Sequence, residues 1–162
     1  AMSISDLLVV MDNGIVKQIG HPMEVYERPA DEFVANFVGH INFLNGEVTG
    51  IKGDRITFHT DCGNLTIKHP GFILSAGDRL KAVIRPESIQ LARSDAGIDK
   101  AMNILEGIID SSMFVGPTMR YTVLVGDKRV YLDESDPQYK GIFNIGEKVK
   151  LILKNRIHML SV

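Results

Sequence analysis

The sequence contains one stretch of residues twice. Residues Asn42–Val48 return as Asn103–Ile109, and residues Gly77–Arg85 return as Gly146–Lys154. The members of the first pair begin 61 residues apart and those of the second pair 69 apart, so the second copy is eight residues longer. Each copy of such a repeat is one structural unit that packs on its neighbour. Most of the chain is therefore expected to be a doubled small module, and residues 1–39, which belong to neither copy, a separate piece.

The spacing of apolar residues inside each copy indicates β-strands. Apolar and polar residues alternate over Arg55–Thr60 and again over Asn64–Lys68, and turns with glycine separate such runs. Ten short strands are expected, five in each copy: Phe43–Ile51, Arg55–Thr60, Asn64–Lys68, Arg79–Ile84, Ser88–Leu91, Ile104–Phe114, Met119–Val125, Arg129–Asp133, Lys148–Leu153 and Ile157–Ser161. This density of short strands predicts a mainly β fold, a doubled OB-like antiparallel barrel. The domain is placed at residues 40–162, with repeats at about 42–93 and 103–162.

Residues 1–39 are expected to form a short α/β piece. Asn13 and Gly14 lie between two apolar runs, and this pair tolerates the positive φ angles of a tight hairpin turn. A short helix follows with Pro22 at its first position, and a second helix with one apolar face ends at Gly39. Helices of two turns are not stable alone. The apolar face is therefore expected to dock onto a larger body.

Composition excludes several classes of protein. The chain of 162 residues is 44% hydrophobic and 23% charged, which allows a real core and argues against disorder. Its net charge is −2 and it has no Trp, whereas a nucleic-acid-binding OB protein needs a basic groove with stacking aromatic residues. Its one cysteine, Cys62, excludes an internal disulfide and fits a reducing cytoplasm. No apolar run approaches the roughly 20 residues that cross a bilayer, so direct membrane insertion is not expected.

Two segments resemble parts of a known family. The hairpin at Asp6–Gly20, the helix at Pro22–Pro29 and the helix at Phe33–Gly39 look like the end of an ABC-importer ATPase domain, after its switch-loop histidine. The segment Ala82–Ile89, with the later Gly116, resembles the TOBE (transport-associated OB) domain of the same ATPases. The order of these segments is more specific than any one of them, and together they cover essentially the whole chain.

The chain also departs from that family. It has no Gly-x-x-x-x-Gly-Lys-Ser/Thr phosphate loop, no signature helix, no strand with a catalytic glutamate and no switch histidine. The resemblance implies that these parts lie upstream of Ala1, and that the chain is a C-terminal piece which alone neither binds nor hydrolyses ATP. ATP and Mg²⁺ are expected only for an intact parent chain. No catalytic, cofactor-binding or metal-ligating residue is expected here.

The resemblance further implies a function. In that family such domains pair below the ATPase dimer, regulate it, and in some members sense a solute or bind a regulatory protein. We therefore expect a regulatory and dimerisation domain of an importer subunit, in a homodimer that meets the permease on the cytoplasmic side of the membrane. A small-anion or solute-binding OB-like module that senses the transported substrate is the alternative. The transported solute, whether polyamine, inorganic ion or sugar, stays open.

A few residues are candidates for contacts. Arg85 and Glu87 flank Pro86 between two expected strands, where they could touch a dimer mate or a regulatory ligand. They could equally form a rigid corner in which Pro86 fixes φ. Gly116 and Tyr121 match the family's Gly…Tyr pattern, and Tyr121 could face a ligand or a dimer mate or be half-buried. Gly116 is expected to allow a tight bend.

Overall fold

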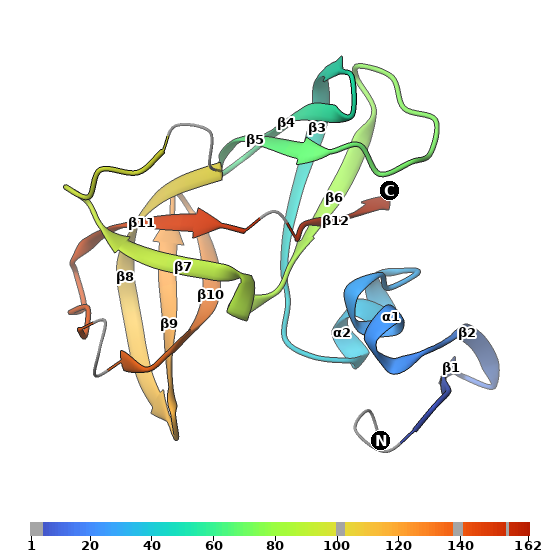
Figure 1. Ribbon diagram of the computed structural model, residues 1–162, viewed down its shortest axis with the longest axis horizontal. Helices are drawn as coiled ribbons and strands as arrows, with labels where there is room; N and C mark the ends of the chain where they lie inside the picture. Colours follow the sequence, from blue (N-terminus) through green and yellow to red (C-terminus); the bar gives the residue numbers. More distant parts are fainter. Residues whose placement is uncertain (1–4, 100–102, 138–140, 155) are drawn as a thin grey trace.

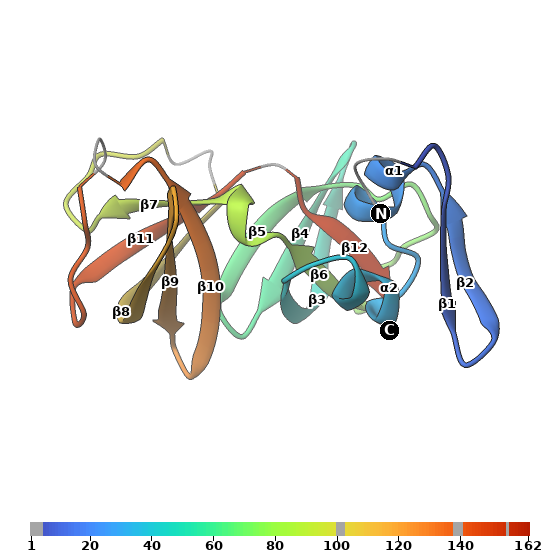
Figure 2. The ribbon, with the colours of Figure 1, turned by 90° about the horizontal axis from the view of Figure 1, so that it is seen from below.

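The computed structural model describes residues 5–99, 103–137, 141–154 and 156–162. Figures 1 and 2 show an elongated molecule with a β-hairpin at one end, two short helices beside it, and two curled sheets that occupy the rest. Strands dominate, and the expected mainly β, OB-like fold is confirmed. Residues 1–4 of the predicted N-terminal piece lie outside the described ranges. Residues 138–140 and 155 of the predicted second repeat lie outside them as well.

The N-terminal piece is a hairpin followed by two helices. Its elements are β1 (Leu8–Asp12), β2 (Ile15–Gly20), α1 (Pro22–Glu27) and α2 (Glu32–Phe37). Asn13 and Gly14 form the hairpin turn with φ angles of 49° and 81°, the left-handed region that this residue pair tolerates. The Asp31 carboxylate accepts a hydrogen bond from the backbone N–H of Val34 at 2.8 Å and so caps α2.

A small apolar core holds this piece together. Val10 from β1, Val25 from α1 and Val34 from α2 are buried against one another, and Leu8, Phe33 and Val38 pack around them. This core is separate from that of the sheets. The piece therefore packs as a unit of its own beside the β-structure.

Beyond α2, the part of the chain that the structure describes is built mainly of strands, with a 3₁₀ turn at η1. The elements are β3 (Asn42–Lys52), β4 (Arg55–Thr60), β5 (Gly63–Lys68), β6 (Arg79–Ile84), η1 (Pro86–Ser88), β7 (Ile89–Arg93), β8 (Asn103–Val115), β9 (Thr118–Val125), β10 (Lys128–Ser135), β11 (Lys148–Leu153) and β12 (His158–Ser161). In β4 the buried Ile56, Phe58 and Thr60 alternate with exposed residues, as period two requires. Every strand expected from the sequence is present, within a few residues at its ends.

The two sheets exchange their last strands. One sheet has the order β12-β6-β3-β4-β5 and the other β10-β9-β8-β11-β7. Strand β7 follows β6 in the first copy but pairs with β11 of the second copy, and β12 of the second copy pairs with β6 of the first. Figure 1 shows both crossings, with β7 beside β11 and β12 beside β6. The copies in the sequence therefore do not coincide with the sheets.

The repeated sequence carries repeated backbone geometry. A Cβ atom on Gly46 would lie 2.2 Å from the carbonyl oxygen of His59, and one on Gly107, the same position in the second copy, 2.5 Å from that of Leu124. Only glycine allows strands to approach so closely. The register then shifts in β3 between Val48 and Gly50, and in β8 at the equivalent point. A glycine followed by a bulge thus bends the long first strand of each copy.

Two equivalent asparagines join the sheets. The side chain of Asn42 accepts from the backbone N–H of Tyr131 and donates to its carbonyl, both at 2.7 Å. Asn103 makes the same pair of bonds to the backbone of Thr66, at 2.7 and 2.9 Å. Each asparagine begins one copy and binds a strand of the other sheet. Most of the buried apolar side chains of both sheets form one cluster, so the two sheets share a core.

Candidate functional site

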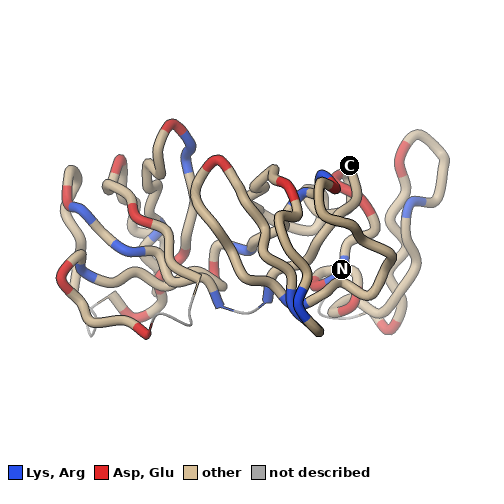
Figure 3. Tube along the Cα trace, turned by 90° about the horizontal axis from the view of Figure 1, so that it is seen from above, with Lys and Arg blue, Asp and Glu red and all other residues tan. Residues whose placement is uncertain are grey.

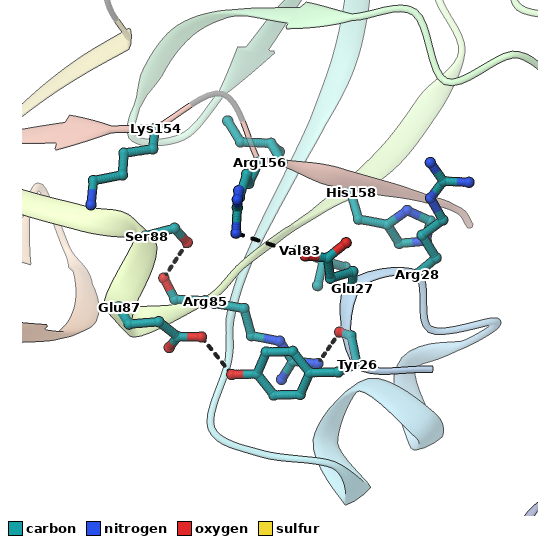
Figure 4. A pocket seen from close by; sticks show the side chains of 11 residues that line it. Tyr26, Glu27, Arg28, Val83, Arg85, Glu87, Ser88, Lys154, Arg156 and His158 are labelled. Carbon is teal, nitrogen blue, oxygen red and sulfur yellow. Dashed lines mark hydrogen bonds and ion pairs between the residues drawn. The ribbon is translucent and has the colours of Figure 1, made fainter. Parts of the chain in front are cut away.

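The most densely connected site is the junction between the N-terminal piece and the sheets. Its centre is Arg85, which follows β6 directly and precedes η1. Pro86 is buried and starts η1, so its fixed φ turns the chain sharply after β6. Glu87 on the same turn is exposed. The local sequence thus directs the Arg85 side chain away from the sheet and toward the helices (Figure 4).

Arg85 binds the N-terminal piece through backbone carbonyls. Its Nη2 donates to the carbonyl oxygen of Tyr26 at 2.7 Å, and its Nη1 lies 3.3 Å from the carbonyl oxygens of both Ala35 and His40. Tyr26 lies in the last turn of α1, Ala35 lies in α2, and His40 lies in the segment before β3. Carbonyl groups near the C-terminal end of a helix carry a partial negative charge and often lack a backbone partner. One buried guanidinium therefore fixes three points of the N-terminal piece.

Tyr26 completes the junction from the other side. The Arg85 guanidinium lies over its ring, 4.0 Å from the centroid, which is a cation–π contact. The Tyr26 hydroxyl donates to the Glu87 carboxylate at 2.5 Å. Burial, together with this hydrogen bond, raises the pKa of Tyr26 to about 12. The phenol therefore stays protonated and keeps donating throughout the physiological pH range.

Further contacts extend the junction along both sides. Lys81 of β6 forms an ion pair with Glu32 of α2. The Nε2–H of His158, in β12, donates to the carbonyl oxygen of Pro29 at 3.0 Å. Burial is the main cause of a lowered pKa for His158, so the ring is neutral at pH 7. The N-terminal piece is thus bonded to the edge strand β12 and to its neighbour β6 in one sheet.

The other candidate residues lie elsewhere. Tyr121 is 1% exposed; its ring meets Phe143 edge-on at 6.0 Å, and its hydroxyl accepts from the Phe143 N–H. This burial leaves no surface for a partner, so Tyr121 is a core residue in this structure. Gly116, with φ 62°, forms the turn between β8 and β9, far along the chain from the junction. Of the contact candidates, only Arg85 and Glu87 come together.

The sequence analysis did not identify three residues whose hydrogen bonds join distant segments of the chain: Tyr26, Asn42 and Asn103. Tyr26 carried a signal, because it lies in the Pro-x-Glu-x-Tyr segment of the family resemblance, but its partners come from residues about 60 positions later. Asn42 and Asn103 carried a stronger signal. Each is a polar residue at the same place in both copies, directly before a strand with an apolar face. A repeated buried amide of this kind indicates a repeated hydrogen bond.

The cysteine Cys62 is poorly suited to act as a nucleophile. Cys62 is half-buried, and burial, with nearby Asp61 adding to it, raises the pKa of its thiol to about 11. A thiol of this kind is a poor nucleophile.

Within the described ranges no group of three His, Cys, Asp or Glu side chains could hold a metal ion, and no helix there could span a membrane. Basic and acidic residues are mixed along the trace (Figure 3).

Fold and junction define a doubled OB-like module joined to a small α/β piece. Comparison with protein families matches residues 82–157 to the TOBE domain. Relatives include the spermidine/putrescine import ATP-binding proteins PotA of Ruegeria pomeroyi and of Marinobacter nauticus, with 30% and 35% identity. Each alignment covers 93% of this chain but 40% of the relative. The chain belongs to the family of ABC-importer ATP-binding subunits and corresponds to their C-terminal, TOBE-containing portion.

The fold also has a solved counterpart. The cytoplasmic molybdate-binding protein ModG matches with a TM-score of 0.62 over 75% of this chain and 96% of its own. The sequences are 14% identical, so the likeness concerns the fold. The chain spans about two fifths of the length of the import proteins that it matches.

Proposed function

We propose that this chain is the regulatory and dimerisation domain of the ATP-binding subunit of an ABC importer, and that it couples the state of the paired ATPase to transport. The observation that supports this most is the Arg85 junction. In the resembled family the hairpin and helices are the end of the ATPase domain. A rigid junction between this end and the β-module transmits movement of one to the other.

The outer face of the hairpin supports the same proposal. Large apolar side chains in and next to β1 and β2 are exposed to solvent: Leu7, Met11, Ile15 and Ile19 are each more than half exposed. An apolar patch of this kind marks a contact surface. We propose that it packs on an ATPase body, which binds ATP and Mg²⁺. The whole subunit then lies on the cytoplasmic face of the membrane against permease subunits, as a homodimer.

The proposed mechanism is a shift of population. The paired ATPase has open and closed arrangements, and a rigid β-module attached to each subunit is placed differently in the two. Any contact that favours one placement of the modules favours one arrangement of the ATPase. A partner module or a small solute can supply that contact.

Light scattering over a concentration series tests dimerisation. A dimer that dissociates only at low concentration supports the proposal, and a monomer at every concentration contradicts it.

Limited proteolysis tests the junction. Arg85→Lys keeps the charge but loses the forked geometry that reaches several carbonyls. We expect cleavage within residues 21–39 to accelerate several-fold, whereas Arg129→Lys, at an exposed position, leaves the rate unchanged. Equal rates in the two variants contradict a coupling role for Arg85.

A further inference from the structure

An open cavity of about 570 Å³ adjoins the junction, between α1 and the segment that joins β11 to β12. This is the size of a pocket for a small ligand. Figure 4 shows the residues that line this cavity, which come from the end of α1, from η1 and from both ends of that segment. The lining thus combines three separate stretches of sequence, 26–28, 83–88 and 154–158, and no short sequence motif predicts the cavity.

The lining of the cavity is positively charged. Four cationic side chains line it, from Arg28, Arg85, Lys154 and Arg156, against the two carboxylates of Glu27 and Glu87. The pKa of His158, which also lines it, is lowered by burial, so this ring adds no charge at pH 7. The lining thus holds an excess of two positive charges, although the whole chain has a net charge of −2.

Both carboxylates of the lining already have partners. Glu87 accepts from the Tyr26 hydroxyl, and Glu27 pairs with Arg156 at 3.7 Å. Lys154 has no ion-pair partner among the described residues. Arg85 is 8% exposed, its acceptors are backbone carbonyls, and its Nε–H is buried without an acceptor in the described part of the chain. A buried cation whose hydrogen bonds go to neutral backbone carbonyls is an unusual arrangement.

We propose that this cavity binds a small oxyanion with at least two negative charges. Phosphate or carboxylate groups fit, because guanidinium and ammonium groups donate charge-assisted hydrogen bonds to both. A dianion neutralises the excess charge of the lining, and Lys154, which has no ion-pair partner among the described residues, is available to contact it. A polyamine is repelled by the same charges, so the cavity does not take the cation that the named relatives import.

The position of the cavity gives such a ligand a consequence. The lining comes from the N-terminal piece, such as Arg28 directly after α1, and from the β-module, such as Lys154 directly after β11, so an anion in the cavity lies between the two. It therefore tightens the junction that the proposed function uses. This regulatory consequence rests on the proposed function, whereas binding itself does not. A chain that binds the anion but stays monomeric contradicts the proposed function and leaves the binding site in place.

Calorimetric titration of the chain tests the site, with pyrophosphate, citrate and spermidine as probes at one fixed ionic strength. We expect pyrophosphate or citrate to bind and spermidine to give no heat. Binding of one anion alone identifies phosphate or carboxylate as the preferred group. Lys154→Gln removes one exposed charge-assisted bond, which weakens binding by about five- to tenfold.

Lys52→Gln is the matched control, because Lys52 is also exposed but lies at the β3–β4 turn. It leaves the affinity unchanged if the cavity is the site. Circular dichroism shows that both variants are folded. Three results overturn the proposal: neither anion binds, Lys52→Gln weakens binding as much as Lys154→Gln, or spermidine binds in a manner that depends on Lys154.

Discussion

The asparagines that join the two sheets give the sharpest test of the fold. In Asn42→Ala the backbone N–H and carbonyl of Tyr131 both lose a 2.7 Å partner in a partly buried site. An unsatisfied buried polar group costs about 1–3 kcal/mol. Because the Tyr131 backbone is only partly buried, the low end applies to each group, and the free energy of unfolding should fall by about 2–3 kcal/mol. Asn103→Ala should cost a similar amount through Thr66.

Urea unfolding followed by far-ultraviolet circular dichroism measures this loss, since the chain has no Trp for fluorescence. The matched control is Asn45→Ala, three residues along the same strand at an exposed position, where a change within about 0.5 kcal/mol is expected. Asn42 and Asn103 share no hydrogen-bond partner, so the double variant should lose the sum of the two single losses in free energy of unfolding. An Asn42→Ala variant as stable as the Asn45→Ala control would refute the claim that the Asn42 side chain stabilises the contact between the two sheets.

The remaining predictions concern three separate positions. Gly46→Ala should lower the free energy of unfolding by about 1–3 kcal/mol, because the new Cβ meets the His59 carbonyl and the strands must separate. Alkylation of Cys62 at pH 8 should be about a hundredfold slower than that of an unperturbed thiol, because a pKa of about 11 leaves little thiolate. Acidification below about pH 6.5 should loosen the contact of His158 with Pro29. The pKa of His158 is lower in the folded protein than in the unfolded chain, so protons bind preferentially to the unfolded or undocked state. The stability that this contact gives at higher pH is therefore lost as the pH falls.

Each of these predictions has a control. Gly50→Ala, where the nearest atom of Thr57 is 3.8 Å from the new Cβ, should be tolerated; a loss equal to that of Gly46→Ala would contradict the steric argument. Urea should restore ordinary alkylation of Cys62, and equally slow labelling in urea would contradict protection by burial. Proteolysis at pH 5.5 and 8 checks His158, and His158→Gln should remove the dependence on pH. A dependence that persists in this variant would assign it to another group.

The sequence determined the elements of this protein because their causes are local. Alternation of apolar residues in stretches such as Arg55–Thr60 is a property of neighbouring positions, and the φ angles of Asn13 and Gly14 follow from their own side chains. The duplication was visible for the same reason. These features were enough to predict a mainly β, doubled OB-like fold.

Tertiary structure alone decided how the elements combine. The fifth strand of each copy, β7 or β12, pairs with a strand of the other copy, and this exchange depends on long-range pairing rather than on local preference. The same holds for the site. Arg85 was a candidate from the sequence, but its contacts with Tyr26, Ala35 and His40 join segments 45 to 59 residues away. The burial of Tyr121 and the excess positive charge of the cavity likewise arise only when distant segments meet, because burial and net local charge are properties of an assembled surface.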